Sequence, residues 1–204
     1  MQKQPSTKSK LKTKGAKRNA KETKFAEQIS EDKAVELLRT SFGRNDYGFR
    51  KVLEHSRAVQ RTALGIAKKL ARKGIFLDIP FIKSGSLLHD IGRSKCPPKT
   101  KSSIKHGIIG AKLLRQKGLF RHADLAERHI GAGITKTEAK KLGLPAKDYL
   151  PLSIEEKIIA HADNLVFGDK IKNFQMAYDC FEKELGKRYA QRLVKLKTQV
   201  ENFS

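Results

Sequence analysis

The most regular hydrophobic pattern in the chain runs over residues 48–73. Val52, Val59 and Ile66 recur there at seven-residue steps, with Lys and Arg residues between them. Because an α-helix repeats every ~3.6 residues, this spacing places the apolar side chains on one face. The pattern predicts a long amphipathic helix that ends before Gly74.

The other segments with helical periodicity are shorter and are separated by glycine or proline. Ser30, followed by two acidic residues, suits a helix start, and Pro80 suits the first turn of another helix. Convincing alternation of apolar and polar residues, typical of a half-buried strand, is absent. The chain is therefore predicted to be all-α, a compact helical bundle. Further helices are expected at 30–38, 80–88, 103–117, 121–130, 135–142, 153–166 and 170–200.

The last of these segments carries apolar and aromatic residues at helical spacing. We expect it to be a C-terminal helical extension that packs on the core. The alternative is the seam of a homodimer, since a long terminal helix with aromatic side chains often packs on a neighbouring copy. The residues concerned are Phe174, Ala177, Tyr178, Phe181, Leu185, Tyr189 and Leu193.

The first 25 residues differ in composition from the rest. They hold nine Lys or Arg residues and one Glu, and their first aromatic residue is Phe25. Such a segment buries too little apolar surface to offset the entropy of ordering, so residues 1–25 are predicted to be a disordered basic tail. The domain then covers 26–204, with its motif core at about 50–168. The tail either solubilises the protein or makes weak contacts with nucleic-acid phosphates.

The net charge is +23, and removing the +8 of the tail leaves +15 on the domain. A surplus of this size attracts polyanions such as nucleic acid, nucleotides or an acidic membrane surface, without choosing among them. With 204 residues, 38% of them hydrophobic, the chain suits one soluble domain with extensions.

The two cysteines, Cys96 and Cys180, form no CxxC pattern, so no disulfide framework is expected. No apolar run approaches the ~18–20 residues needed to span a bilayer. The N-terminus lacks the apolar stretch of a secretory signal. These features favour a cytoplasmic protein without membrane association.

One apolar run ends at two adjacent residues that can bind metal. In SGSLLHDIGRSKCPP, residues 84–98, buried-type residues give way to His89 and Asp90 and then to a loop rich in Lys and Pro. At a helix end both side chains can reach one metal ion, or the carboxylate can bridge two. Carboxylate oxygen plus imidazole nitrogen is a ligand set for Mn²⁺, Fe²⁺ or Zn²⁺.

Four further candidates stand near helix ends or on apolar faces. His55 shares a stripe with Val59, a position where a histidine is more often packed in a core than bound to metal. His106 and His129 stand beside glycines, and Asp163 lies on an otherwise apolar face, where a carboxylate is costly to bury unless it is paired or binds metal. Each signal is weak alone, but they occur together on separate helices.

The order His … His-Asp … His … His … Asp resembles that of the HD superfamily of metal-dependent phosphohydrolases. The segments HDIGR, HGIIGA, RHIGAG and AHADNL carry the resemblance, which covers roughly residues 50–168. Within it the chain is similar to the HDIG subgroup, to small archaeal HDIG proteins and to bacterial HD hydrolases that split diadenosine tetraphosphate symmetrically.

The resemblance implies one or two divalent ions, of Mn, Fe, Mg, Co, Ni or Zn. A metal-activated hydroxide would then hydrolyse a phosphate ester or anhydride of a nucleotide or a similar small phosphorylated substrate. The resemblance further implies that a first ion is held by His55, His89, Asp90 and Asp163. The second ion would be held by His106 and His129, with Asp90 bridging and thus catalytic.

Cations are needed for the charge that develops on the phosphoryl oxygens. Arg93, three residues after the bridging carboxylate, is the foremost candidate, and Lys105 beside His106 is the second. Asn164 is a candidate to orient a ligand or bind substrate. A solvated loop is the simpler interpretation of Lys95, Lys99 and Lys101.

Four other polar residues stand outside this set. His161 precedes Asp163 by two positions and faces away from it on a helix, so a structural role is expected. His122, at a helix start, is expected on the surface. Thr135 is expected to cap a helix, the alternative being that it lines the pocket mouth with Lys136.

Three functional hypotheses remain open from the sequence. The ligand set favours a phosphohydrolase, whose activity would survive deletion of residues 1–25. The basic charge favours an RNA-associated protein that acts on an RNA phosphate or only binds RNA, with salt-sensitive retention. Di-iron oxygen chemistry is the third hypothesis, and a requirement for O₂ would identify it.

Overall fold

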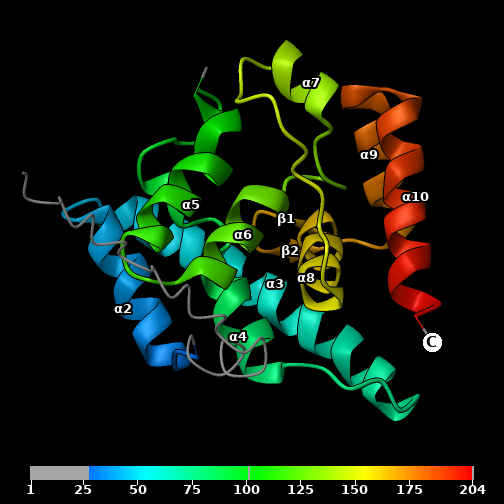
Figure 1. Ribbon diagram of the computed structural model, residues 1–204, viewed down its shortest axis with the longest axis horizontal. Coiled ribbons are helices and arrows are strands. Elements are labelled where there is room, and N and C mark those ends of the chain that lie inside the picture. Colours follow the sequence, from blue (N-terminus) through cyan, green and yellow to red (C-terminus); the bar gives the residue numbers. More distant parts are fainter. Residues whose placement is uncertain (1–27, 101, 204) are drawn as a thin grey trace, which may run out of the picture.

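The computed structural model describes residues 28–100 and 102–203 as a helical bundle with one short β-hairpin (Figure 1). The all-α prediction is confirmed. The tail predicted at 1–25 and Lys101 lie outside the described residues. None of the described helices combines the length and the apolar character needed to cross a membrane.

Most of the elements are joined by short connections. In chain order the elements are α2 (Glu31–Phe42), α3 (Asp46–Arg72), α4 (Ile79–Leu88), the 3₁₀ helices η1 (Ile91–Ser94) and η2 (Ser103–Lys105), α5 (His106–Arg115), α6 (Phe120–Arg128), α7 (Lys136–Lys141), α8 (Ile154–Asn164), β1 (Val166–Phe167), β2 (Lys170–Ile171), α9 (Phe174–Leu185) and α10 (Lys187–Glu201). The longest connection, residues 142–153, joins α7 to α8.

Several helices begin where the sequence predicts. The Ser30 side chain accepts a hydrogen bond from the Lys33 amide at the start of α2. Thr135 and Glu138 form a capping box at the start of α7, which confirms the predicted cap. These side chains satisfy backbone N–H groups that have no partner inside the helix. Helix α2 runs on to Phe42, four residues beyond its predicted end.

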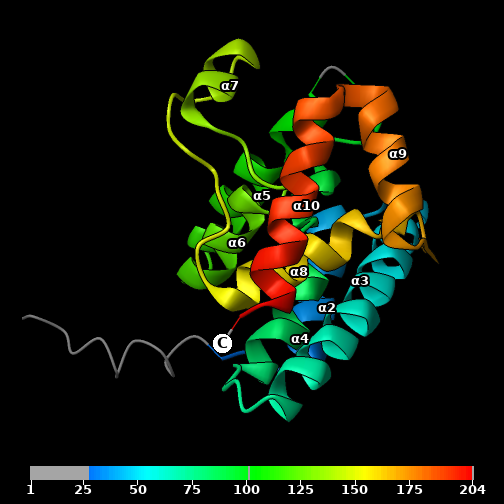
Figure 2. The same cartoon turned by 90° about the vertical axis from the view of Figure 1, so that its right-hand side faces the viewer.

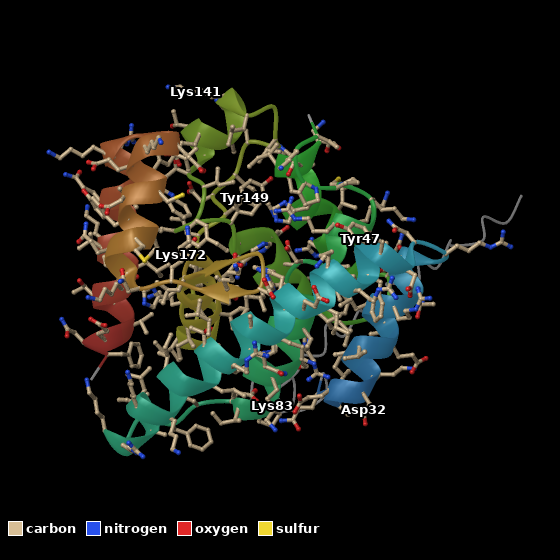
Figure 3. All side chains as sticks on the ribbon, turned by 180° about the vertical axis from the view of Figure 1, so that it is seen from behind. Asp32, Tyr47, Lys83, Lys141, Tyr149 and Lys172 are labelled. Carbon is tan, nitrogen blue, oxygen red and sulfur yellow. The ribbon has the colours of Figure 1, made fainter. Side chains whose placement is uncertain are left out.

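Helix α4 packs at the centre of the bundle, and most of its residues are buried. One core cluster packs Phe81 and Ile82 against α3 and α8, and a second packs Leu87 and Leu88 against α2, α5 and α6. A helix packed against several neighbours needs apolar and small residues on most of its surface, which its sequence supplies. In the view of Figure 3, which shows the side opposite to that of Figure 1, α3 lies nearest the viewer, and Tyr47 marks the region of its start.

The single helix predicted over 170–200 is wrong. Val166 pairs with Ile171 in the β1–β2 hairpin, and two helices follow. Gly186 separates α9 from α10 with a φ of 94°, a conformation that ends a helix and that glycine adopts readily. The two helices lie side by side (Figures 1 and 2). The apolar spacing continues across Gly186, so the periodicity alone did not reveal the break.

Candidate metal centre

The six side chains predicted as metal ligands meet in one cluster, although they come from five different helices or helix ends. Three overlapping groups of their ligand atoms each lie within 4.8 Å of one another. The cluster is built from His55 on α3, His89 and Asp90 after α4, His106 at the start of α5, His129 after α6 and Asp163 on α8.

Asp90 stands between two sets of histidines. Its Oδ1 lies 3.1 Å from Nε2 of His106 and 3.5 Å from Nε2 of His129. Its Oδ2 lies 3.9 Å from Nε2 of His55. The two carboxylate oxygens therefore face different nitrogen groups, the arrangement needed to bridge two cations.

Asp163 faces the other side of the cluster. Its Oδ1 lies 2.9 Å from Nε2 of His55 and 3.4 Å from Nε2 of His89. The three potential ligand groups are His55, His89 and Asp90, then His89, His129 and Asp163, and then Asp90, His106 and His129. Since Asp163 also lies near His55, the first group can be extended by its carboxylate.

All four imidazoles are oriented in the same way. Each Nδ1 is bonded to a backbone carbonyl: His55 to Gly168 at 2.7 Å, His89 to Ser86 at 2.7 Å, His106 to Ser103 at 2.6 Å and His129 to Ala126 at 2.8 Å. Since a carbonyl only accepts, Nδ1 carries the proton in every ring, and the lone pair of a neutral ring is on Nε2. Such outer bonds fix the tautomer and direction of metal-binding histidines.

Two observations show that the donor set fits a metal ion. The buried Nε2 of His89 has no hydrogen-bond partner among the described residues. Nε2 of His106 and Nε2 of His129 lie 3.0 Å apart, and in neutral rings both present lone pairs. Facing lone pairs need a cation or a proton between them. Imidazole with carboxylate suits Mn, Fe, Co, Ni or Zn, while Mg prefers oxygen alone.

The electrostatics favour ionised carboxylates. Burial alone would raise the pKa of Asp90, but the adjacent imidazoles, His106 foremost, hold it well below its usual range. The imidazoles of His89 and His55 likewise lower the pKa of Asp163 despite its burial. Burial tends to lower the pKa of His55, yet the hydrogen bond to Asp163, together with the negative charges of Asp163 and Asp90, outweighs it and raises that pKa to about 9. Burial lowers the pKa of His129.

Glycine brings η1 against α5 and so places Asp90 beside His106. A Cβ at Gly92 would stand 1.9 Å from the backbone oxygen of His106 and 2.7 Å from the amide nitrogen of Gly110. Both contacts are with backbone, so no side chain fits there. This gives a physical reason for the glycine in the HDIG motif.

Arg93 holds Asp90 from the outer side. Its Nε lies 3.2 Å from Oδ1 of Asp90, and its Nη1 donates to Oγ of Ser103 at 2.7 Å. Because the Ser103 carbonyl also accepts from His106, one residue of η2 supports both the arginine and a potential ligand.

The cluster opens into a cavity of about 830 Å³. Arg93 and Asn164, two of the three residues predicted to bind substrate, line this cavity, and so does Lys99. The Asn164 side chain donates to the Gly131 carbonyl at 2.9 Å, which fixes its position. Lys105 is exposed and is not among the lining residues, and the same holds for Lys95 and Lys136.

The two remaining histidines lie outside the cluster. His161 is buried against Phe174, with ring centroids 6.1 Å apart, and faces away from the cavity as predicted. The surface position predicted for His122 is wrong: this side chain is 1% exposed and Nε2 lies 2.8 Å from Oγ of Ser84. The position of His122 near the start of a helix did not show that the face of α6 that carries it packs on α4.

Sequence reasoning missed two parts of the cavity wall. The Gly168 carbonyl that orients His55 comes from the β-hairpin, which carried no sequence signal. Arg192 on α10 also lines the cavity. The sequence could have indicated this position, because Arg192 follows Tyr189 by three residues and therefore lies on the same face of the helix.

Comparison with known proteins is consistent with this geometry. The HD domain model matches residues 52–168, which include all six clustered side chains. An uncharacterized protein of Methanocaldococcus jannaschii is 44% identical over 175 residues, 84% of this chain and 97% of that protein. No solved structure matches the chain significantly.

Two further relatives carry the name tRNA (cytidine(56)-2'-O)-methyltransferase. The protein of Thermoplasma volcanium is 41% identical over 156 residues, 76% of this chain, and that of Picrophilus torridus is 41% identical over 153 residues, 74% of this chain. Each match covers 42% of the relative, so more than half of each relative lies outside it. With the domain match, the ordered ligand motifs and the helical bundle, the chain belongs to the HD domain family.

Proposed function

We propose that this protein is a metal-dependent phosphohydrolase that cleaves a phosphate ester or anhydride of a nucleotide or a similar small phosphorylated substrate. The observation that carries the proposal is the common orientation of four imidazoles, each with Nδ1 on a backbone carbonyl and Nε2 toward Asp90 or Asp163. A fold does not by itself imply a reaction, whereas side chains arranged in this way can bind divalent ions.

His55, His89, Asp90 and Asp163 would hold one divalent ion, and His106, His129 and Asp90 a second. Bound divalent ions lower the pKa of coordinated water and neutralise charge on phosphoryl oxygens. The chain's own residues then have defined tasks. Arg93 fixes the direction of Asp90 and presents cationic N–H groups beside it. Asn164 keeps the Gly131 segment beside Asp163.

The test is phosphate release from nucleotides, dinucleoside polyphosphates and a 3′-phosphorylated RNA oligonucleotide, with Mn²⁺, Co²⁺, Mg²⁺ or Fe²⁺ added. Wild type is compared with Asp90→Ala and with Asp32→Ala, a carboxylate control on the exposed start of α2. We expect metal-dependent turnover that Asp90→Ala abolishes and Asp32→Ala retains. Metal-loaded wild type that turns over no substrate contradicts the proposal.

The alternative function, an RNA-associated HD protein, has its own support. The chain carries a net charge of +23, and two relatives are named as enzymes that act on tRNA. Turnover of the RNA oligonucleotide alone, or salt-sensitive RNA retention without turnover, favours this alternative. Deletion of residues 1–25 then separates a contribution of the basic tail from that of the domain.

A further inference from the structure

The part of the cavity wall that α9 and α10 form carries four apolar or aromatic side chains beside Glu184 and Arg192. Phe181 and Leu185 of α9 and Tyr189 and Leu193 of α10 line it. Leu185 is 53% exposed and Tyr189 is 37% exposed, so large apolar surfaces stand open to the cavity. Exposed apolar surface gathered at a binding cavity commonly marks a ligand contact.

This wall is not part of the matched HD unit, which ends at residue 168. It is nevertheless held firmly in place. Arg192 of α10 donates from Nη1 to both Oε atoms of Glu138 at 2.7 Å, and from Nη2 to the Gly133 carbonyl. Helix α10 also packs along α8 and α9 (Figure 2). The wall is thus a fixed surface.

Phe181 links the apolar wall to the metal cluster. The position of a Cβ at Gly131 lies 3.7 Å from Cε1 of Phe181, and Gly131 follows His129 by two residues. The carbonyl of Gly131 accepts from Asn164, the neighbour of Asp163. The ring of Phe181 therefore lies close to the segment that follows His129.

We propose that α9 and α10 form a subsite for the flat organic group of a phosphorylated substrate, with Phe181 and Tyr189 as stacking surfaces; this rests on the phosphohydrolase function proposed above. A nucleoside phosphate is the matching ligand class, because bases stack on aromatic side chains. Lys51, Arg93 and Lys99 line the same cavity and suit its phosphate. A cavity of about 830 Å³ lies within the range of roughly 300–1,000 Å³ common for small-molecule sites.

The experiment compares two probes that share sugar and phosphate but differ in the base: adenosine 5′-monophosphate and ribose 5-phosphate. The kcat/KM ratio of the two probes is measured for metal-loaded wild type, Tyr189→Ala, Tyr189→Phe and Phe181→Ala. Phe76→Ala is the matched aromatic control, since Phe76 is 90% exposed and does not line this cavity. Circular dichroism verifies the fold of each variant.

We expect wild type to prefer the base-bearing probe, and Tyr189→Ala and Phe181→Ala each to reduce this preference on the order of ten-fold, by loss of stacking. Ribose 5-phosphate turnover should fall much less than adenosine 5′-monophosphate turnover in these two variants, and Tyr189→Phe and Phe76→Ala should keep the preference. A wild-type ratio near one, or a ratio that neither alanine variant changes, overturns the proposal.

If wild type turns over neither probe, fluorescence anisotropy with N-methylanthraniloyl-AMP decides the binding question separately. Binding that weakens on the order of ten-fold in Tyr189→Ala, but not in Tyr189→Phe, supports the subsite while hydrolysis of these probes fails. Absence of binding, or equal binding by all variants, overturns it.

Discussion

Nε2 of His106 and Nε2 of His129 lie 3.0 Å apart, while each ring is bonded through Nδ1 to a backbone carbonyl. The two nitrogens cannot both be lone-pair acceptors at this distance without a cation or proton between them. The backbone of η2 and α6 thus holds two lone pairs in place for a shared positive charge, beside the negative charge of Asp90.

Replacing His129 should remove one ion from the centre. We expect Mn²⁺-loaded wild type to hold about two ions per chain and His129→Gln about one, because the second group loses a nitrogen ligand. Atomic emission after gel filtration gives the count, with His161→Gln as a buried-histidine control. Equal ion content in wild type and His129→Gln would show that His129 is not a ligand.

Arg93→Lys should lower activity although it keeps the positive charge. Lysine lacks the fork that joins Asp90 to Ser103 in the present geometry. Loss of such an outer partner commonly costs ~10–100-fold in activity or metal affinity, and we expect a fall in kcat/KM of that size. Steady-state kinetics against Lys95→Ala, an exposed loop cation, tests this. Full activity of Arg93→Lys would mean that only its charge matters.

Two glycine substitutions should have opposite effects on stability. At Gly92 an added Cβ meets the His106 carbonyl oxygen at 1.9 Å, so Gly92→Ala should lower the free energy of unfolding by about 3 kcal/mol or more. Gly65 lies exposed within α3 with nothing within 4 Å of a Cβ. Gly65→Ala should therefore stabilise by roughly 0.5–1 kcal/mol. Urea unfolding measures both, and a stable Gly92→Ala protein would refute the close approach.

His122 should make stability depend on pH. Burial, with a smaller effect of the Arg121 charge, lowers its pKa from 6.5 to about 4. Below pH 6.5 the imidazole of the unfolded chain therefore binds a proton that the folded chain does not bind. The contribution of His122 to stability is complete above the unfolded-state pKa of 6.5 and is lost as the pH falls toward the folded-state pKa of about 4. Between about pH 7.5 and about pH 5 the His122 contribution to this loss is about 2 kcal/mol.

Urea unfolding of metal-free wild type and His122→Gln at both pH values isolates this contribution, because the other histidines are common to both proteins. The variant should lose about 2 kcal/mol less than wild type on acidification. An identical loss in the two proteins would place the titration elsewhere.

The pair of Arg192 and Glu138 should stabilise the attachment of α10. Glu138 is 6% exposed and takes two hydrogen bonds from this guanidinium, so Arg192→Met leaves a buried carboxylate with fewer partners. We expect a loss of roughly 3 kcal/mol, part of which Glu138→Gln restores in the double variant. Arg188→Met, an exposed control on the same helix, should change stability by less than about 0.5 kcal/mol. Additive effects at the two positions would exclude a coupled pair.

The sequence by itself determined the helical class and most helix positions, because these follow from local spacing and caps. The 48–73 pattern corresponds to α3, and Thr135 caps α7 as expected. It also identified the six clustered side chains, since their order along the chain is that of the HD family, whose domain model matches.

Only the tertiary structure decided which atoms of these residues face one another. The φ of Gly186 and the hairpin after α8 are local backbone events without a periodic signal, so the C-terminal helix was predicted unbroken. The burial of His122 and the contact of Arg192 with Glu138 depend on which helix faces pack together. Such contacts join residues distant in sequence, and a pattern read along one chain carries no information about their distance in space.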